Sequence, residues 1–162
     1  MTSFDIRIDD LSSEQTQELL ALHLRGMHAA SPPGTVFALD LSGLKQPNVI
    51  VWSAHREGRI AAIGAIKLLG DGAAEVKSMR THPDFLRQGA AAAVLDTIIN
   101  EARQRGLRRL SLETGSGEDF DAALTLYRKR GFVNGEKFSD YEPNPFNQFL
   151  HMDLSATHAE QA

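Results

Sequence analysis

The sequence contains no cysteine. This absence excludes disulfide bridges, thiolate metal sites and any covalent mechanism through a cysteine thioester, so a group transfer by this chain would have to be direct. The six histidines are scattered, and no two of them have a spacing that would place two ligands on one helical face beside a carboxylate. The sequence therefore predicts no bound metal.

Long apolar runs and an excess of basic charge are also missing. No stretch approaches the ~18 consecutive apolar residues of a membrane span, and the first residues lack a basic segment followed by an apolar run. We therefore expect a cytoplasmic protein with no membrane partner. Lys and Arg number 17 against 21 Asp and Glu, which disfavours a nucleic-acid partner because duplex binders usually carry a strongly basic face. A small-molecule partner is favoured by elimination.

The chain length of 162 residues suits one domain with a single core. Neither an internal repeat nor a low-complexity tract, beyond the alanines at 90–93, indicates a domain boundary. Residues 1–154 are therefore predicted to form one domain. The C-terminal tail, 155–162, is predicted to be disordered.

The first half of the chain has the periodicity of strands around one helix. Apolar residues that alternate with polar ones indicate half-buried strands, and glycine turns between such runs indicate an antiparallel meander. Residues 30–47 predict a loop with one helical turn, of a length that often faces a substrate. The other predicted elements are a strand over 4–8, a helix capped by Ser12 or Ser13, and strands over 49–54, 60–69 and 74–81.

The second half alternates helices and strands. A period of 3.6 residues begins at Gly89 and ends at Gly106, which predicts a long helix. The strand, crossover helix and strand between Glu75 and Glu113 require a parallel pair, so the sheet is predicted to be mixed. After the long helix we expect a strand over 107–113, a helix over 119–130 and a final pair of strands, the last over 149–154.

Small residues cluster at the start of the long helix, in the segment Pro83–Ala93. The first turn of a helix supplies unpaired N–H donors and the positive end of the helix dipole, which together suit a pyrophosphate. Gly89 permits backbone angles closed to other residues, and Arg87 can add a charge. The alternative is a helix start whose alanines serve helix propensity and packing. The residues alone leave both open, and neither the three-glycine dinucleotide pattern nor the Gly-Lys-Ser/Thr phosphate loop is present.

The order of elements and this loop resemble the GNAT superfamily of N-acetyltransferases. Leu86–Ala91 matches the superfamily's cofactor motif, Gln/Arg-x-x-Gly-x-Gly/Ala, at Gly89 and Ala91. The first position carries Leu86 in place of a polar residue. The resemblance implies that main-chain groups and Arg87 hold the pyrophosphate of the cofactor.

A second segment, 124–132, is similar to the family's helix that ends in Leu-Tyr and is followed a few residues later by Gly-Phe. The family often has an asparagine seven residues before this tyrosine, where the present chain has Phe120. Segments 75–81 and 110–116 look like those of one branch of the superfamily, the YsnE-like proteins.

The resemblance implies an α/β fold, namely a three-layer α-β-α domain whose central mixed, mostly antiparallel sheet is splayed at the cofactor site. It also implies acetyl-CoA as co-substrate, with no metal. The Met79 amide is the candidate donor to the thioester oxygen, on which negative charge develops during acyl transfer. The residues expected to contact acetyl-CoA are Met79, Arg80, Thr81, Arg87, Gln88, Gly89, Ala90, Ala91, Ala92 and Tyr127.

Three residues are candidates for acid and base chemistry. Tyr127 is the candidate acid, since a phenol with a pKa of about 10 can protonate a leaving thiolate whose own pKa is about 8.5; the alternative is a tyrosine that only packs in the core. The attacking amine must first lose a proton, and Glu113 is the candidate base, with Glu75 as its rival. Either glutamate could instead be an exposed strand-end charge or an ion-pair partner of Arg80 or Lys77.

The function implied is transfer of an acetyl group from acetyl-CoA to the amine of a small molecule, or of a peptide, in a ternary complex. A non-catalytic acyl-CoA-binding or sensing module and an acyltransferase with a hydroxyl or thiol acceptor are the alternatives. Trp52 and residues 138–141 could wall the acceptor pocket; the alternative is that these aromatic side chains belong to the core. Arg25, His28, Lys77 and Arg80 are candidates for holding an acidic group on the acceptor; the alternative is that they are solvated surface residues. An exposed strand edge near the C-terminus leaves a homodimer open.

Overall fold

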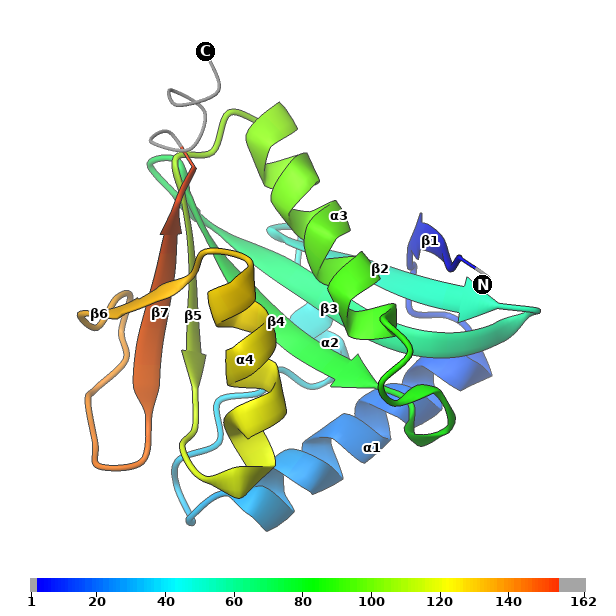
Figure 1. Ribbon diagram of the computed structural model, residues 1–162, viewed down its shortest axis with the longest axis horizontal. Helices are drawn as coiled ribbons and strands as arrows, with labels where there is room; N and C mark the ends of the chain where they lie inside the picture. Colours follow the sequence, from blue (N-terminus) through cyan, green and yellow to red (C-terminus); the bar gives the residue numbers. More distant parts are fainter. Residues whose placement is uncertain (1–2, 155–162) are drawn as a thin grey trace.

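The computed structural model describes residues 3–154 and places one mixed sheet between two layers of helices (Figure 1). The predicted C-terminal tail, 155–162, lies outside the described residues. In chain order the elements, including the short 3-10 helices η1 and η2, are β1 (Asp5–Ile8), α1 (Glu14–Ala30), α2 (Leu41–Leu44), β2 (Val49–Arg56), β3 (Arg59–Gly70), β4 (Ala73–Thr81), η1 (Pro83–Phe85), α3 (Ala90–Gln104), β5 (Arg109–Thr114), η2 (Glu118–Phe120), α4 (Asp121–Lys129), β6 (Val133–Gly135) and β7 (Gln148–Asp153).

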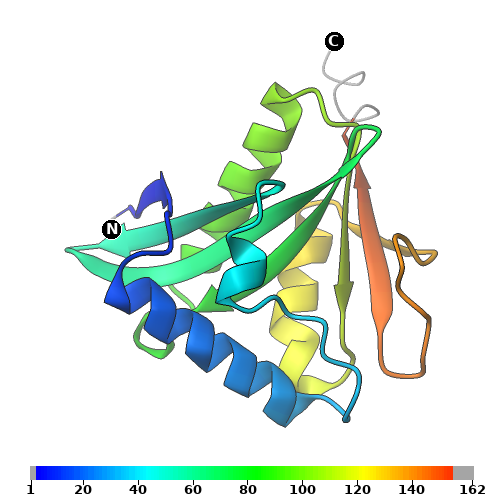
Figure 2. The same cartoon turned by 180° about the vertical axis from the view of Figure 1, so that it is seen from behind.

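The seven strands lie in the order β1-β2-β3-β4-β5-β7-β6, and every pair is antiparallel except β4 with β5. Helices α3 and α4 cover one face of the sheet, and α1 and α2 cover the other (Figures 1 and 2). The predicted α-β-α architecture and mixed sheet are therefore confirmed. Within residues 3–154, no helix combines the length and the apolar composition that crossing a membrane requires. The single-domain boundary and the homodimer stay predictions.

The predicted elements are present, with small differences at their ends. Ser13 caps α1, because its hydroxyl accepts a hydrogen bond from the Thr16 amide. The predicted helix over 119–130 begins instead with the 3-10 turn η2, which follows Gly117, a residue that offers no side-chain cap. The strand predicted from residue 107 begins at Arg109.

Two apolar clusters hold the layers together. The larger cluster joins the sheet to α3 and α4 and includes Val94 and Ile98, which are completely buried. The smaller cluster joins the opposite face to α1 and α2, and it contains Leu19 and Leu20 of α1 together with Ile63 of β3. Each strand of the central hairpin therefore contributes to two cores, as alternating side chains require.

Strand β4 contains a bulge at Ser78 and Met79, opposite Gly64 of β3. Ser78 has a positive φ of 59°, a left-handed conformation that is uncommon for a residue with a side chain. A Cβ atom at Gly64 would lie 2.8 Å from a methyl carbon of Val94 and still closer to the Met79 sulfur. Residue 64 must therefore be glycine, because the side chains of the bulge and of α3 lie too close to β3 at this position to leave room for a Cβ atom.

Strands β4 and β5 separate soon after they begin. Their parallel pairing joins Ala73–Glu75 to Arg109–Ser111 and then stops. Beyond this point β4 remains paired with β3, and β5 remains paired with β7 along its whole length. Figure 1 shows the two strands diverging, with α4 in front of the gap. The predicted splay of the sheet is present at the predicted pair of strands.

Replacing Gly64 by alanine should lower the free energy of unfolding by about 1–3 kcal/mol, the usual cost of overpacking. The stiff Val94 side chain cannot turn away from the added methyl group. We expect a smaller cost for Gly64→Ala in a Val94→Ala background, measured by urea unfolding of the two single variants and the double variant. An equal cost in both backgrounds would contradict this packing argument.

Candidate active site

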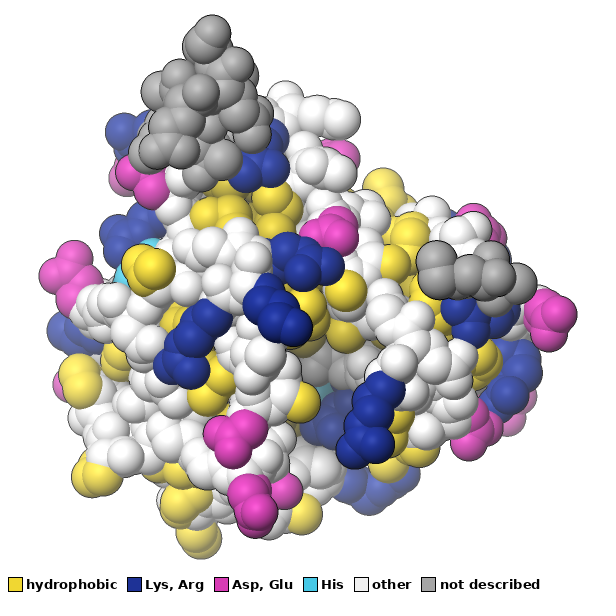
Figure 3. Space-filling model, in the orientation of Figure 1, with side chains coloured by type: hydrophobic (Ala, Val, Ile, Leu, Met, Phe, Trp, Pro, Cys, Tyr) yellow, Lys and Arg dark blue, Asp and Glu magenta, His cyan; other side chains and the backbone are white. Residues whose placement is uncertain are grey.

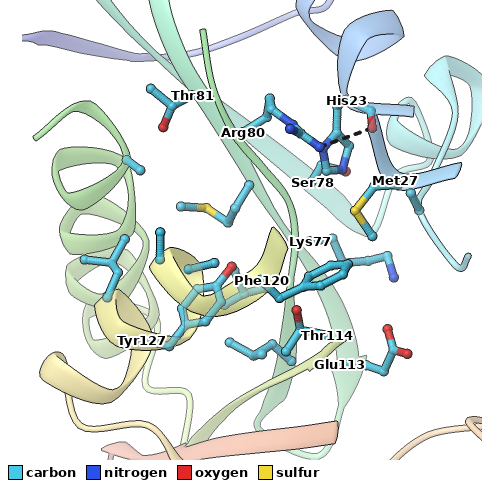
Figure 4. Close-up of a pocket in the computed structure, with 18 of the residues that line it drawn as sticks. His23, Met27, Lys77, Ser78, Arg80, Thr81, Glu113, Thr114, Phe120 and Tyr127 are labelled. Atoms are coloured by element: carbon cyan, nitrogen blue, oxygen red, sulfur yellow. Dashed lines mark hydrogen bonds between the residues drawn. The ribbon is translucent and has the colours of Figure 1, made fainter. Parts of the chain in front are cut away.

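A cavity of about 350 Å³ lies where β4 and β5 diverge. Its walls come from α1, the segment after α1, β4, β5 and α4 (Figure 4). Of the residues predicted from the sequence, the cavity brings together Glu75, Met79, Arg80, Thr81, Ala91, Glu113 and Tyr127. The other predicted residues, Arg87, Gln88, Gly89, Ala90 and Ala92, are outside its lining and belong to the loop and first turn of α3.

The side chains of β4 divide this cavity into two sides. Met79 points toward α3, and its sulfur lies beside Gly64 on the face of β3 that Val94 and Ile98 cover. Arg80 points toward α1, where its guanidinium contacts His23. Lys77 lies on the same face as Arg80 although the two are three residues apart, because the bulge inserts one residue between them. The α1 side of the cavity therefore carries the charged residues of β4.

The loop before α3 presents backbone donors rather than side chains. Arg87 and Gly89 both have positive φ, at 62° and 87°, and Gly89 is the N-cap residue with no side-chain hydrogen bond to the helix. The Gln88 amide oxygen does not cap the helix, because it accepts a 2.6 Å hydrogen bond from Arg56. The N–H groups of residues 90–92 therefore have no side-chain acceptor among the described residues, and an anion could bind them.

The surface around this helix start favours a negatively charged ligand. Figure 3 shows a hollow between the beginning of α3 and α4, and lysine and arginine side chains border it. Leu86, which departs from the family motif, is exposed to solvent and also lines the cavity between β4 and β5.

The ring of Tyr127 is packed in the core, and its hydroxyl group lies in the cavity. The residue is 7% exposed, and its ring contacts Phe132 edge-on with 5.8 Å between centroids. Its hydroxyl points into the cavity (Figure 4), and burial raises the pKa of the phenol above its ordinary value. The group is therefore protonated at neutral pH. The Tyr127 ring therefore belongs to the core, while the residue also lines the cavity.

The two glutamates have different surroundings. Burial raises the pKa of the Glu113 carboxyl to about 7, against the opposing effects of a hydrogen bond from Asn147 and the charge of Lys77. Glu75 is 3% exposed, and one of its oxygens lies 3.1 Å from the Lys77 ammonium and accepts a hydrogen bond from Tyr141. The ion-pair alternative therefore holds for Glu75. Glu113 keeps a carboxyl that can exchange a proton near neutral pH.

Tyr141 is the member of the predicted aromatic segment 138–141 that reaches the charged residues. Its hydroxyl is bonded to Glu75, and its ring packs edge-on against Phe37 with 5.3 Å between centroids. Burial, followed by the charge of Glu75, raises the pKa of this phenol. Tyr141 therefore remains a neutral hydrogen-bond donor behind the Glu75–Lys77 pair.

His23 and Ser78 belong to the cavity although the sequence did not single them out. His23 is 5% exposed, and its Nδ1 accepts a 3.0 Å hydrogen bond from Arg80 Nε. Burial, and then the charges of Arg80 and Lys77, lower the pKa of His23 to about 4, so the imidazole is neutral. Its position four residues after Leu19, on the apolar face of α1, could have indicated burial.

The predicted roles of Arg25 and His28 in holding the acceptor are wrong. Both side chains are exposed on α1, and neither lines the cavity. The helical period places them on faces of α1 turned away from β4. Between Ser3 and Leu154, no group of three or more His, Asp or Glu side chains could hold a metal ion.

The chain is similar in sequence to known acetyltransferases. A model of the acetyltransferase (GNAT) family matches residues 13–132. The chain is 45% identical to the uncharacterized N-acetyltransferase YedL of Escherichia coli (strain K12), over 93% of this chain and 95% of that protein. It is 44% identical to the uncharacterized N-acetyltransferase YsnE of Bacillus subtilis (strain 168), over 90% of this chain and 96% of that protein. An IAA acetyltransferase of Azospirillum brasilense is 35% identical, over 72% of this chain and 75% of that protein.

Solved structures share the fold. A candidate acyl-CoA N-acyltransferase of Klebsiella pneumoniae superposes with a TM-score of 0.78 at 28% identity, over 93% of this chain and 97% of that chain. A GNAT family acetyltransferase of Elizabethkingia anophelis, solved with acetyl-CoA bound, superposes with a TM-score of 0.69 at 19% identity, over 94% and 99%.

The raised pKa of Glu113 predicts a specific dependence of stability on pH. Between its ordinary value of 4.5 and about 7, the folded protein binds more protons than the unfolded chain, so the free energy of unfolding falls as pH rises through this window. Glu113→Gln should remove this component, and the variant should gain stability relative to wild type between about pH 4.5 and about pH 8, measured by urea unfolding. Glu18→Gln, which changes an exposed carboxylate on α1, is the matched control. A stability difference between wild type and Glu113→Gln that does not vary with pH would contradict the raised pKa.

Proposed function

The chain belongs to the GNAT family of N-acetyltransferases, and from that premise we propose that it transfers an acetyl group from acetyl-CoA directly to the amine of a small-molecule acceptor. One observation carries the proposal. The gap between β4 and β5 connects an uncapped helix start to a cavity that holds a protonated tyrosine and a glutamate that titrates near neutral pH. The absence of cysteine is consistent with a ternary complex without an acyl-enzyme intermediate.

The loop and first turn of α3 would hold the pyrophosphate of acetyl-CoA. The left-handed conformations at Arg87 and Gly89 turn this loop, and the N–H groups of residues 90–92 point out of the helix start without side-chain acceptors. Arg87 is exposed and can add a charge to the same site. The Elizabethkingia anophelis protein, which has the same fold, was solved with acetyl-CoA bound, and this supports acetyl-CoA as the ligand.

The unpaired edge of β4 would hold the arm that carries the thioester. From Val76 to Thr81, this edge has no partner on β5, so its backbone groups can form hydrogen bonds with an extended ligand. We assign the Met79 amide to the thioester oxygen, on which negative charge develops. Arg80 and Thr81 would contribute main-chain contacts along the same edge.

Tyr127 and Glu113 would move the protons of the reaction. Tyr127 lines the cavity in its protonated form, so its hydroxyl is placed to donate a proton to the departing thiolate as negative charge develops on the sulfur. Glu113 can accept a proton from the incoming ammonium, because a base is most effective when its pKa lies near the working pH. Glu75 is the weaker candidate for the base, since Lys77 and Tyr141 already engage its carboxylate.

The pyrophosphate site can be tested with Gly89→Val. A side chain at φ 87° strains the loop and shifts the N–H groups of the first turn, so we expect the dissociation constant for acetyl-CoA to rise about tenfold or more. The measurement is calorimetric titration. Gly106→Val is the matched control, because Gly106 also has a positive φ of 75° with open space around it but lies past the other end of α3. Equal affinities in the two variants would contradict the site.

The catalytic role of Tyr127 can be tested with Tyr127→Phe, which keeps the packed ring and removes the hydroxyl. We expect kcat for thiol release across a library of amines to fall about 10²-fold or more, as loss of a general acid usually produces. Affinity for acetyl-CoA should change far less. An unchanged kcat would remove Tyr127 from the mechanism. Acetyl-CoA binding by the wild type with no turnover on any amine would instead support the non-catalytic acyl-CoA-binding alternative.

A further inference from the structure

We propose that Arg80 and Ser78 form a subsite for a carboxylate, so that the acceptor is an amino acid carrying both the amine to be acetylated and a free carboxylate. This inference rests on the proposed function for the amine and extends it to a second recognised group. Both residues lie on β4 and line the cavity, and Figure 4 shows Arg80 turned toward α1.

The Arg80 guanidinium is a charge without a carboxylate partner. Its Nε donates to His23 Nδ1 at 3.0 Å, and one terminal nitrogen lies 3.4 Å from the His23 carbonyl oxygen. Both of these partners are neutral, and within residues 3–154 no carboxylate lies within 4.0 Å of Arg80. A half-buried cation in this position is costly unless an anion joins it, and a guanidinium fork fits a carboxylate.

His23 holds this guanidinium in one orientation. The imidazole is neutral and accepts from Nε, which fixes the plane of the guanidinium group against α1 and leaves terminal nitrogen Nη1 without a partner among the described residues. A preorganised fork of this kind loses less conformational freedom when an anion binds.

Ser78 supplies a second, independent indication of a ligand. The residue is 8% exposed, and its hydroxyl has no hydrogen-bond partner among residues 3–154. A buried hydroxyl without a partner is unfavourable. Ser78 lines the same cavity two residues before Arg80, so its hydroxyl can donate to an anion held there. The left-handed backbone at Ser78 places this group in the bulge rather than on the regular face of the strand.

The pattern of charges points to an acceptor that carries both signs. On the α1 side of the cavity, Lys77 is neutralised by Glu75. Glu113, Asp119 and Arg80 line the same cavity, and none of the three forms an ion pair with another. An amine beside Glu113 and a carboxylate on Arg80 would satisfy both groups within one molecule. The apolar walls at Met27, Phe37 and Phe120 suit an aliphatic or aromatic body between them.

The phosphates of acetyl-CoA are the other anion that Arg80 could bind. Strand geometry argues against them, because Arg80 points toward α1 whereas the uncapped helix start belongs to α3 on the opposite face of the sheet. A peptide acceptor is disfavoured as well, because its reacting residue has an amide in place of the free carboxylate.

The test compares amino acids with their primary amides on the purified protein. The pairs are L-alanine, L-phenylalanine, L-methionine and β-alanine, each against its amide, with CoA-saturated protein for binding and acetyl-CoA for turnover. For at least one pair, the acid should be favoured over the amide by about 10- to 100-fold in affinity and in kcat/KM. Arg80→Gln and Ser78→Gly should each reduce this ratio, and Arg80→Lys should retain part of it. Glycine tolerates the positive φ of residue 78, so that variant removes only the hydroxymethyl group.

The outcomes separate this inference from the proposed function. Acetylation of amines without any preference for the acid, or with the amide preferred as for a peptide terminus, would overturn the carboxylate subsite and leave the acetyltransferase function standing. Acid-selective binding that depends on Arg80 but yields no turnover would support the subsite and count against the function. If Arg80→Gln weakens CoA binding as much as it weakens acid binding, the guanidinium serves the cofactor and the inference is wrong. Arg105→Gln, an exposed arginine on the far end of α3, controls for the lost charge.

Discussion

The arrangement of this protein depends on one interruption of backbone pairing, the parting of β4 from β5 after three residue pairs. Strand β4 stays hydrogen-bonded to β3, and β5 stays hydrogen-bonded to β7. Neither strand can therefore move to close the gap without breaking the hydrogen bonds to its other neighbour. Buried backbone N–H and C=O groups need partners, so the open edge of β4 is the place where a bound molecule can complete the sheet. The cavity, the Tyr127 hydroxyl and the start of α3 are arranged around this edge.

The bulge at Ser78 and Met79 decides which chemistry faces each side of the gap. In a regular strand, Lys77 and Arg80 would point to opposite faces. The additional residue puts both cations on the α1 side and leaves the Met79 side chain against α3. It also leaves the Ser78 hydroxyl buried, with no hydrogen-bond partner in the described part of the chain. Gly64 makes this irregularity sterically acceptable on the neighbouring strand. The two cations then differ in their partners, because Lys77 pairs with Glu75 whereas Arg80 contacts the neutral His23.

Local patterns predicted much of the fold. Period-two and period-3.6 segments gave the order of strands and helices, and the crossover between Glu75 and Glu113 required the one parallel pair that the sheet contains. The motif around Tyr127 also singled out a residue that lines the cavity. Arg25 and His28 lie on exposed faces of α1 and do not line the cavity, whereas His23 shares the buried face of Leu19, a difference that follows from the helical period.

The sequence by itself determined the elements, the need for glycine before α3, and the absence of any cysteine-based mechanism, since these depend on residue type and short-range spacing. Only the tertiary structure decided that Glu75 is engaged by Lys77 and by Tyr141, 66 residues away, and that Glu113 is left to titrate near neutral pH. It also decided that Arg80 faces α1, where no carboxylate of residues 3–154 pairs with it. Burial and neighbouring charges set these properties, and both arise only when segments distant along the chain pack together.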